Sequence, residues 1–512
     1  MFVRVYMYLY FHEPHKVIRA IFLRAYTYFK RNLLYISQIE LAFFLFLVYQ
    51  RTLLPGVGYS GDTAKFQFIG KVLGTPHETG YPTYILLNHL FINLFPFGEL
   101  AYKANLLSAL ISIVSVLVLF RILLLINIDP FIASTVSFSF GVTYTIWSQS
   151  IIAEVYTLNL LFVCLVIFFL LKWNISRQDK YFLAACALYS ISFGNHLTMI
   201  TFLPAIIFFV WHTNKKVLCD SKNIISVSIF ILLGALQYVY IFWRVNDPHP
   251  LYIEMEPHNF REFIWYMRGG NFNHLMFTYS INQIMNIRIP MLIKLLNREF
   301  PFMLFLPVIG FITFEKRGIR NFLLLCAFGN IFFSINYDIQ DIFVYFIPSY
   351  LIITIFLAQG LQWLWIKLSS EVRWLNKAFL LLIPIALLIS NYHLVDQSSN
   401  HEDADRTLAV LHAVGKDAII IAPNYDYIEY FWYYLAGQGI QNERNIYLQY
   451  HFNVDQIKNY IYQDVPFYIP FQKKNMPIDL AVYVMSSQQR KTLEDQGLSL
   501  VRVQNGLFKI VP

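Results

Sequence analysis

Acidic and histidine side chains fall at the ends of several apolar stretches of this chain, where they could meet in one polar site. Asp62 lies in the polar stretch GYSGDTAKFQF, directly after the first long apolar segment. A carboxylate held there could accept the proton of a hydroxyl group, or it could cap the helix that follows. His196 offers a similar choice between binding a phosphate and capping a tight helical turn. The residues alone leave both choices open.

Glu154 occupies a more demanding position, in the stretch WSQSIIAEVYTLN. We expect it one turn inside an apolar helix, where a carboxylate costs about 2.5 to 3.5 kcal/mol at membrane depth. Water, a sugar hydroxyl or a bound divalent cation would remove that cost. Asp338 and Asp341 belong to the tyrosine-rich stretch NYDIQDIFVYFIPSY, a combination that suits sugar binding. We therefore expect Glu154 to face the same cavity as Asp62.

The composition is that of a polytopic membrane protein. Of the 512 residues, 57% are apolar, 18% are aromatic and only 14% are charged. The net charge of +8 comes from short clusters of Lys and Arg between apolar runs, which indicates membrane topology rather than binding to nucleic acid. The four cysteines form no CxxC pair, and P-loop, GxSxG and HExxH motifs are absent. The sequence therefore supports no disulfide framework, zinc site, ATP-driven transport or serine hydrolysis.

Stretches of about 20 apolar residues predict the membrane-spanning helices. A cytoplasmic interfacial segment, residues 1–37, comes first, and a transmembrane domain, residues 38–394, follows it. About eleven spans are expected, near residues 38–54, 103–126, 129–147, 151–171, 181–194, 197–212, 223–243, 299–314, 321–337, 342–367 and 376–394.

The distribution of Lys and Arg predicts the orientation of these spans. The loops KWNISRQDK, TNKKVLCDSK, EKRGIR and KLSSEVRWLNK all fall on the side of the N-terminus, which is therefore cytoplasmic. The outer loops 55–100 and 244–298 mix aromatic and polar residues, as helices in the membrane interface do. Residues 395–512 are also expected outside, as a small α/β domain in which DAIIIAP, DLAVYVM and LSLVRV are strands.

Five of these stretches together resemble the GT-C glycosyltransferases, which use a sugar linked to a lipid phosphate. GDTAKFQFIGKVLGTPHETGYPTYILL, WSQSIIAEVYTLN, GNHLTM, FREFIWYMRGGNF and DIQDIFVYFIPSYL follow one another within residues 38–365. They look like the motif set of a largely bacterial membrane family whose animal member is the O-mannosyltransferase acting on plexin-type receptors. Family members usually carry an acidic residue shortly after the aspartate, where this chain has Thr63, Ala64 and Lys65. The region from residue 400 onward also resembles the tail of bacterial members.

The resemblance implies a GT-C-like fold and an inverting glycosyltransferase of the bacterial inner membrane, with its active site and C-terminal domain outside the cytoplasm. The donor would be a polyprenyl-phosphate sugar such as mannose, and the acceptor would preferably be a protein Ser or Thr. Asp62 would be the general base. Nine further residues would bind substrate or line the site, and none would be a metal ligand: His77, Tyr81, Glu154, Tyr156, Asn159, His196, Arg268, Asp341 and Tyr345.

Three other functions are compatible with the sequence. A related enzyme could modify a lipid or a cell-envelope glycan instead of a protein. A transporter or flippase of a lipid-linked glycan would also be polytopic, but transporters often show related halves and this chain shows none. A non-catalytic scaffold that presents the C-terminal domain would tolerate changes at Asp62 and Glu154.

Overall fold

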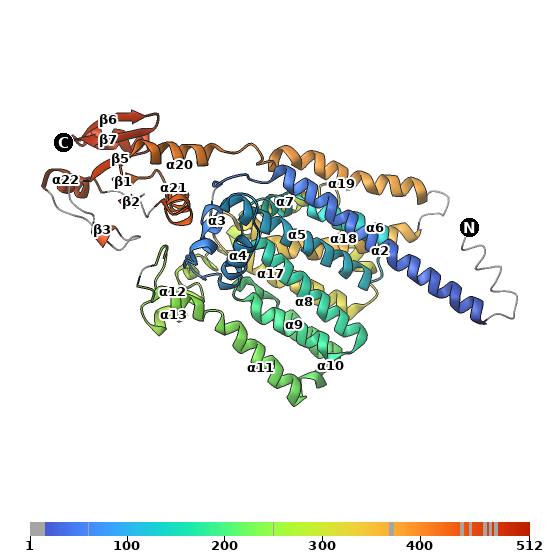
Figure 1. Cartoon of the computed structure of the whole chain (residues 1–512). Coiled ribbons are helices and arrows are strands. Elements are labelled where there is room, and N and C mark those ends of the chain that lie inside the picture. Colours follow the sequence, from blue (N-terminus) through green and yellow to red (C-terminus); the bar gives the residue numbers. More distant parts are fainter. Residues whose placement is uncertain are drawn as a thin grey trace.

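Figure 1 shows a bundle of long helices with a small β-sheet at one end, and the helix α20 (Glu402–Ala413) leads from the bundle to the sheet. The helix α2 (Lys16–Thr52) begins at the opposite end of the bundle. The computed structural model describes residues 16–59, 61–248, 250–367, 373–440, 445–449, 453–463, 468–469, 474–475 and 480–511.

Seven helical segments among the described residues are long and apolar enough to cross a membrane, so the chain is an integral membrane protein. Three of them combine consecutive helices that continue one another. The segments are α5 (Leu100–Leu125), α8 (Tyr156–Ser176), η1 (Leu197–Phe202) with α10 (Leu203–Asn214) and η2 (Lys215–Leu218), α11 (Ser221–Leu236) with α12 (Val239–Val245), α17 (Arg317–Ile335), η5 (Ile342–Phe346) with α18 (Ile347–Lys367), and α19 (Arg373–Val395).

The other four expected spans are also helical, although they fall outside this set. They correspond to α2, to α6 (Pro130–Gly141) with α7 (Tyr144–Ser150), to α9 (Asp179–Ser192) and to α16 (Phe305–Thr313). Residues 1–15 of the expected interfacial segment lie outside the described residues. From Lys16 onward that segment is not separate, because it continues into the first span as the single helix α2. No glycine or proline interrupts residues 16–52, so nothing breaks the helix there.

Small residues allow two of these helices to pack at very short range. A Cβ atom at Gly310 in α16 would lie 1.8 Å from the carbonyl oxygen of Phe356 in α18. A Cβ atom at Gly360 would lie 2.2 Å from the carbonyl oxygen of Leu306. Only glycine fits at these two positions, as is common where membrane helices approach closely.

Short helices form the end of the bundle that faces the sheet (Figure 1). In α4 (Pro82–Leu94), Leu86, Leu90 and Leu94 recur every four residues and are exposed, which suits a helix lying in the membrane interface. The helices of the two outer loops are α3 (Thr63–Val72), α4, α13 (Phe260–Met267), η3 (Gly270–Leu275), α14 (Ile281–Gln283), η4 (Ile284–Arg288) and α15 (Ile289–Glu299).

The C-terminal region has the α/β character expected from the sequence. Its five-stranded sheet has the order β2-β1-β5-β7-β6, in which β2, β1 and β5 are parallel and β5, β7 and β6 are antiparallel. Two short strands, β3 and β4, form a separate antiparallel pair. After α20 the elements are β1 (Asp417–Ile421), α21 (Tyr425–Trp432), η7 (Tyr433–Gly437), β2 (Asn445–Gln449), α22 (Val454–Gln463), β3 (Tyr468–Ile469), β4 (Lys474–Asn475), β5 (Ala481–Val484), α23 (Ser487–Asp495), β6 (Ser499–Gln504) and β7 (Leu507–Val511).

The sheet has a separate apolar core on one face and joins the core of the bundle on the other. Ile419 and Ile421 of β1 pack in the separate core, whereas Ile420 between them belongs to the large cluster that continues into the bundle. The helix α21 fills that junction. Its Trp432 ring lies 5.6 Å from the ring of Tyr252 in the second outer loop. The C-terminal region is thus packed directly against the outer loops.

Candidate active site

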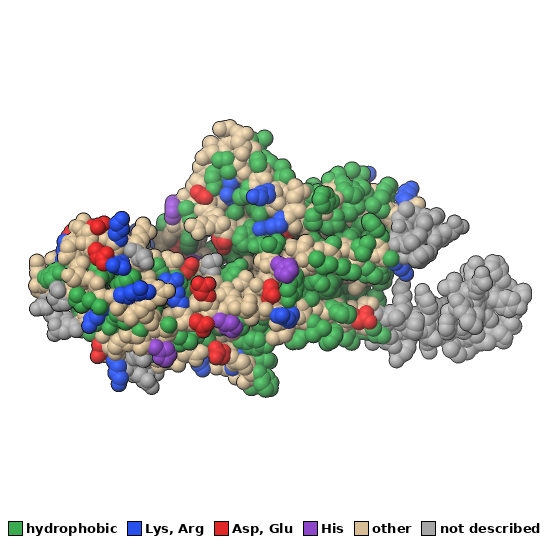
Figure 2. All heavy atoms as spheres, turned by 90° about the horizontal axis from the view of Figure 1, so that it is seen from above, with side chains coloured by type: hydrophobic (Ala, Val, Ile, Leu, Met, Phe, Trp, Pro, Cys, Tyr) green, Lys and Arg blue, Asp and Glu red, His purple; other side chains and the backbone are tan. Residues whose placement is uncertain are grey.

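A polar cavity of about 330 Å³ lies where the two outer loops meet the ends of α8, η1 and η5. Figure 2 shows acidic and histidine side chains gathered near the junction between the C-terminal region and the largely hydrophobic bundle. Eight of the ten site residues expected from the sequence line this cavity: Asp62, His77, Tyr81, Tyr156, His196, Arg268, Asp341 and Tyr345. These eight come from five separate stretches of sequence, which the fold brings together.

Asp62 occupies the N-cap position of α3, but its carboxylate caps no backbone N–H. Its Oδ1 accepts a hydrogen bond from Lys65 Nζ at 3.0 Å, and its Oδ2 lies 3.4 Å from His77 Nε2. Burial raises the pKa of Asp62, but its electrostatic interactions with His77 and Lys65 outweigh this effect and hold the pKa below its usual value. The carboxylate is therefore ionised at neutral pH, and its side chain is 34% exposed.

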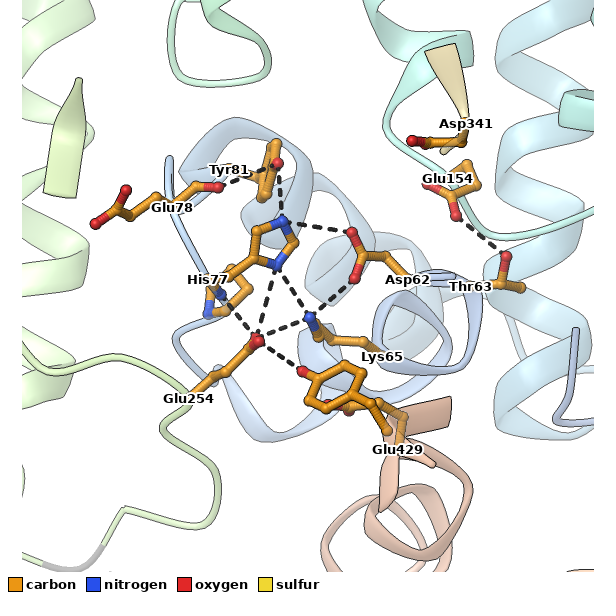
Figure 3. A network of polar contacts seen from close by, with 12 residues as sticks. Asp62, Thr63, Lys65, His77, Glu78, Tyr81, Glu154, Glu254, Asp341 and Glu429 are labelled. Carbon is orange, nitrogen blue, oxygen red and sulfur yellow. Dashed lines mark hydrogen bonds and ion pairs between the residues drawn. The ribbon is translucent and has the colours of Figure 1, made fainter. Parts of the chain in front are cut away.

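Lys65 is fully buried one turn after Asp62, and three acceptors surround its ammonium group (Figure 3). Nζ lies 3.0 Å from Asp62 Oδ1, 2.8 Å from Glu254 Oε2 and 3.0 Å from His77 Nδ1. Burial lowers the pKa of Lys65, but the carboxylates of Asp62 and Glu254 raise the pKa by more than burial lowers it. The net shift of the pKa is therefore upward. The side chain therefore carries a positive charge inside the protein.

Glu254 links this charged group to the C-terminal region. It also accepts hydrogen bonds from the backbone N–H of His77 at 2.7 Å and from the Tyr425 hydroxyl of α21 at 2.5 Å. Burial raises the pKa of Glu254, but the charge of Lys65 and the bond from His77 lower it well below its usual range. Behind it, the carboxylate of Glu429 accepts the hydrogen bond of the Tyr252 hydroxyl, which lies 2.8 Å from Oε1 and 3.1 Å from Oε2. A helix more than 350 residues from Asp62 in sequence thus helps to hold its ion-pair network.

His77 and Tyr81 form the side of the cavity next to Asp62. Because the Lys65 ammonium can only donate, His77 Nδ1 accepts from it, and the other ring nitrogen, Nε2, is left to donate. That Nε2 faces both Asp62 Oδ2 and the Tyr81 hydroxyl, the latter at 3.2 Å. Tyr81 stands edge-on to Phe66, with ring centroids 5.5 Å apart. These contacts fix the orientation of both side chains.

The opposite wall is built of tyrosines around one histidine. The Tyr156 hydroxyl donates to Asp341 Oδ2 at 3.0 Å. The His196 ring lies 5.6 Å from the Tyr156 ring and 5.2 Å from the Tyr345 ring. His196 also caps η1, because its Nδ1 accepts from the backbone N–H of Thr198. The capping alternative is therefore observed for His196, and its ring lines the cavity as well.

Arg268 contributes a positive charge to the lining of this cavity. Its guanidinium group lies 4.7 Å from the centroid of the Trp265 ring, a cation–π contact that holds the side chain in place. An arginine in this position can bind a phosphate with two parallel hydrogen bonds.

The structure corrects the expected position of Glu154 and places Asn159 away from the cavity lining. Glu154 is not one turn inside a helix, because α8 begins only at Tyr156. Tertiary hydrogen bonds satisfy backbone groups of this segment: the Glu154 N–H donates to the Ser108 hydroxyl, and the Ile151 carbonyl accepts from the Leu54 N–H. Asn159 is buried within α8 and does not line the cavity.

Glu154 is nevertheless a neighbour of Asp62, although more than 90 residues separate them in sequence. The Thr63 hydroxyl donates to Glu154 Oε1 at 3.1 Å, and Thr63 directly follows Asp62. Glu154 does not itself line the cavity. Figure 3 shows Glu154 and Asp341 on one side of Asp62, with Lys65 and Glu254 on the other. The acid therefore lies just behind the cavity wall rather than in it.

Four members of the network around Asp62 were not expected as site residues from the sequence: Lys65, Glu254, Tyr425 and Glu429. The last three lie in stretches that mix acids with aromatic residues, YIEMEP for Glu254 and YDYIEYFWYY for Tyr425 and Glu429. The same combination of acids and tyrosines was the signal that identified Asp341. Nothing in the sequence spacing, however, connects these stretches to Asp62.

Part of this chain is similar in sequence to known proteins. Residues 62–218 match the model of the TMEM260 protein O-mannosyl-transferase N-terminal domain. The protein O-mannosyl-transferase TMEM260 of Mus musculus is 29% identical over 193 residues, which cover 37% of this chain and 27% of the mouse protein. The match therefore spans about a quarter of the length of that relative.

Two solved structures share the fold over most of the chain. ArnT from Cupriavidus metallidurans, in a structure bound to undecaprenyl phosphate, has a TM-score of 0.58 at 10% identity and covers 92% of this chain and 97% of its own. The second is the oligosaccharyltransferase AglB from Archaeoglobus fulgidus, in complex with an inhibitory peptide and a dolichol-phosphate. It has a TM-score of 0.51 at 12% identity, and the match covers 82% of this chain and 65% of AglB. Residues 62–218 are thus similar to the TMEM260 protein O-mannosyl-transferases, and the chain shares its overall fold with ArnT and AglB.

Proposed function

We propose that this chain is an inverting glycosyltransferase that moves one sugar from a polyprenyl-phosphate carrier to an acceptor hydroxyl, preferably that of a protein Ser or Thr. The observation that carries the proposal is the cavity that combines the ionised, partly exposed carboxylate of Asp62 with the cation of Arg268. A membrane protein has easy access to a donor whose lipid tail lies among its helices. The relatives support the choice of substrates, because a polyprenyl phosphate, a dolichol-phosphate and a peptide are bound in the solved structures.

In the proposed reaction the acceptor oxygen attacks the anomeric carbon of the donor. The bond between that carbon and the phosphate oxygen breaks, and the bonding electrons leave with the polyprenyl phosphate. The acceptor proton passes to Asp62, which lines the cavity and whose Oδ2 lies beside His77 Nε2. Arg268 binds the phosphate as its charge increases. Direct displacement inverts the configuration of the sugar carbon.

The tyrosines and acids of the opposite wall would bind the sugar. Asp341 accepts from the Tyr156 hydroxyl and has further lone pairs for sugar hydroxyls. The rings of His196, Tyr156 and Tyr345 offer apolar faces against which a sugar ring can pack. Glu154 lies behind this wall and accepts a hydrogen bond from the Thr63 hydroxyl, so it acts on the site through Thr63. We therefore assign it to positioning and not to direct contact with the donor.

The test measures sugar transfer by the purified chain in lipid nanodiscs. The donors are polyprenyl-phosphate mannose and polyprenyl-phosphate glucose, and the acceptors are Ser- and Thr-containing peptides and a lipid-linked glycan. The Asp62→Asn variant should lose about 100- to 10,000-fold in kcat, the usual contribution of a general base, while its affinity for the donor changes little. Asp338→Asn is the matched control, because Asp338 is an exposed acid of the same region that pairs with Tyr279 instead of lining the cavity.

Two results would contradict the proposal. Normal turnover by a folded Asp62→Asn protein would remove the base assignment. A wild-type protein that transfers no sugar to any acceptor, but moves the intact lipid-linked glycan across the bilayer, would identify a flippase instead.

A further inference from the structure

The ammonium group of Lys65 sits at a point where three potential metal ligands converge. Asp62 Oδ1, Glu254 Oε2 and His77 Nδ1 lie 2.8 to 3.0 Å from Nζ. Two carboxylates and an imidazole are a donor set that divalent transition metals also use. These distances are those of hydrogen bonds, whereas zinc ligands lie at about 2.0 to 2.2 Å. Among the described residues, no group of three His, Cys, Asp or Glu side chains is arranged to hold a metal ion.

The contacts of the cluster fit an ammonium ion and do not fit a metal. An ammonium has three N–H donors, one for each of the three acceptors. Lys65 itself is buried, so its position leaves no space for a second cation between Asp62 and Glu254. We propose that Lys65 is the built-in cation of this active site: its ammonium takes the place of a divalent metal between Asp62 and Glu254, and the reaction needs no divalent cation.

The surroundings of Glu254 hold it in position for this role. Its Oε2 accepts from the His77 backbone N–H as well as from Lys65, and its Oε1 accepts from the Tyr425 hydroxyl. The carboxylate is therefore fixed on both oxygens before any substrate arrives. Without Lys65, the carboxylates of Asp62 and Glu254 would face each other with no cation between them. A cation from solution would then have to take the place of the Lys65 ammonium between the two carboxylates.

The activity arm of the test rests on the proposed function. Wild-type transfer should be unchanged after prolonged treatment with EDTA and after addition of Mn²⁺. The Lys65→Ala variant should lose roughly 100-fold in kcat, the usual loss when a preorganised electrostatic group is removed, and methylammonium, which donates hydrogen bonds, should restore part of it. Tetramethylammonium carries the same charge without an N–H donor and should restore nothing. Lys71→Ala is the matched control, because Lys71 lies on the same helix but is exposed.

A second arm needs no turnover and separates this proposal from the proposed function. Methylammonium should raise the thermal unfolding temperature of Lys65→Ala but not that of the wild type, because a ligand that binds only the folded state stabilises it. The double variant Lys65→Ala, Glu254→Gln should not respond, since one of the two carboxylates is gone.

The proposal would be overturned if EDTA abolished wild-type transfer and Mn²⁺ restored it. It would equally be overturned if methylammonium stabilised wild type, Lys65→Ala and the double variant to the same extent. If Lys65→Ala did not fold, the chelation experiment on the wild type would still decide. If the wild type transferred no sugar, the proposed function would fail while the unfolding experiment still tested the role of Lys65.

Discussion

Replacing Tyr425 by Phe should loosen the contact between the C-terminal region and the site without changing the shape of either. The change removes only the hydroxyl that donates to Glu254 Oε1 at 2.5 Å. The ring stays, and with it the contact to the Lys65 ammonium, which lies 5.3 Å from the ring centroid. A hydrogen bond to a charged group contributes about 1.5 to 3 kcal/mol. Glu254 is only 10% exposed, so water cannot readily replace the lost donor.

Hydrogen exchange of the α21 backbone amides measures this effect directly. If α21 exchanges through opening of this contact, a loss of 1.5 to 3 kcal/mol makes exchange roughly 10- to 140-fold faster. Tyr427→Phe is the matched control, because Tyr427 lies on the same helix and its hydroxyl accepts a hydrogen bond from Arg406 at the surface. Exchange should change at most about fivefold in the control. Equal exchange rates in Tyr425→Phe and Tyr427→Phe would refute the reasoning.

Two further predictions concern pH and membrane orientation. Burial raises the pKa of Glu429 from its usual value to about 7, so the folded state binds a proton more tightly than the unfolded state does between about pH 4.5 and 7. Stability should fall as the pH rises through this range, and the difference in unfolding temperature between wild type and Glu429→Gln should show it; a difference that is constant from pH 5 to 8 would contradict the shift. For orientation, a membrane-impermeant maleimide added outside should label a cysteine placed at the exposed Ser399 and miss the native, exposed Cys219 until the membrane is opened. The reverse pattern would place the cavity on the cytoplasmic side.

The sequence predicted the cavity residues well because their stretches end apolar helices. Asp62, His196 and Asp341 each fall where an apolar run meets a polar turn, and such turns lie at the same end of the bundle when the helices alternate in direction. Resemblance to a family added His77, Tyr81 and Arg268, whose positions in the outer loops no hydrophobic pattern could fix. The strands β1, β5 and β6 were also readable, because their apolar residues are flanked by turn residues.

The remaining features depend on contacts between distant segments. The chain at Glu154 looks helical in sequence, but residues 151–155 are not helical: the Glu154 N–H donates to the Ser108 hydroxyl, and the Ile151 carbonyl accepts from the Leu54 N–H. Lys65 stands in the first turn of α3, and only the arrival of Glu254 and Tyr425 from two other regions shows what it does. Local propensity carries no information about partners that lie 180 or more residues away.

The contact of α21 with the first outer loop also sets the time at which the site can be completed in the cell. Asp62 enters the membrane region early in synthesis, but Tyr425 and Glu429 are made more than 360 residues later. At about 5 to 20 residues per second, roughly 20 to 70 s pass between the two events. Lys65 lacks its distant partners for most of that interval, and Glu254 lacks Tyr425 from its own synthesis until the end of it. A nascent chain that stalls before α21 therefore lacks both the hydroxyl that donates to Glu254 and the helix whose Trp432 packs against Tyr252 of the second outer loop.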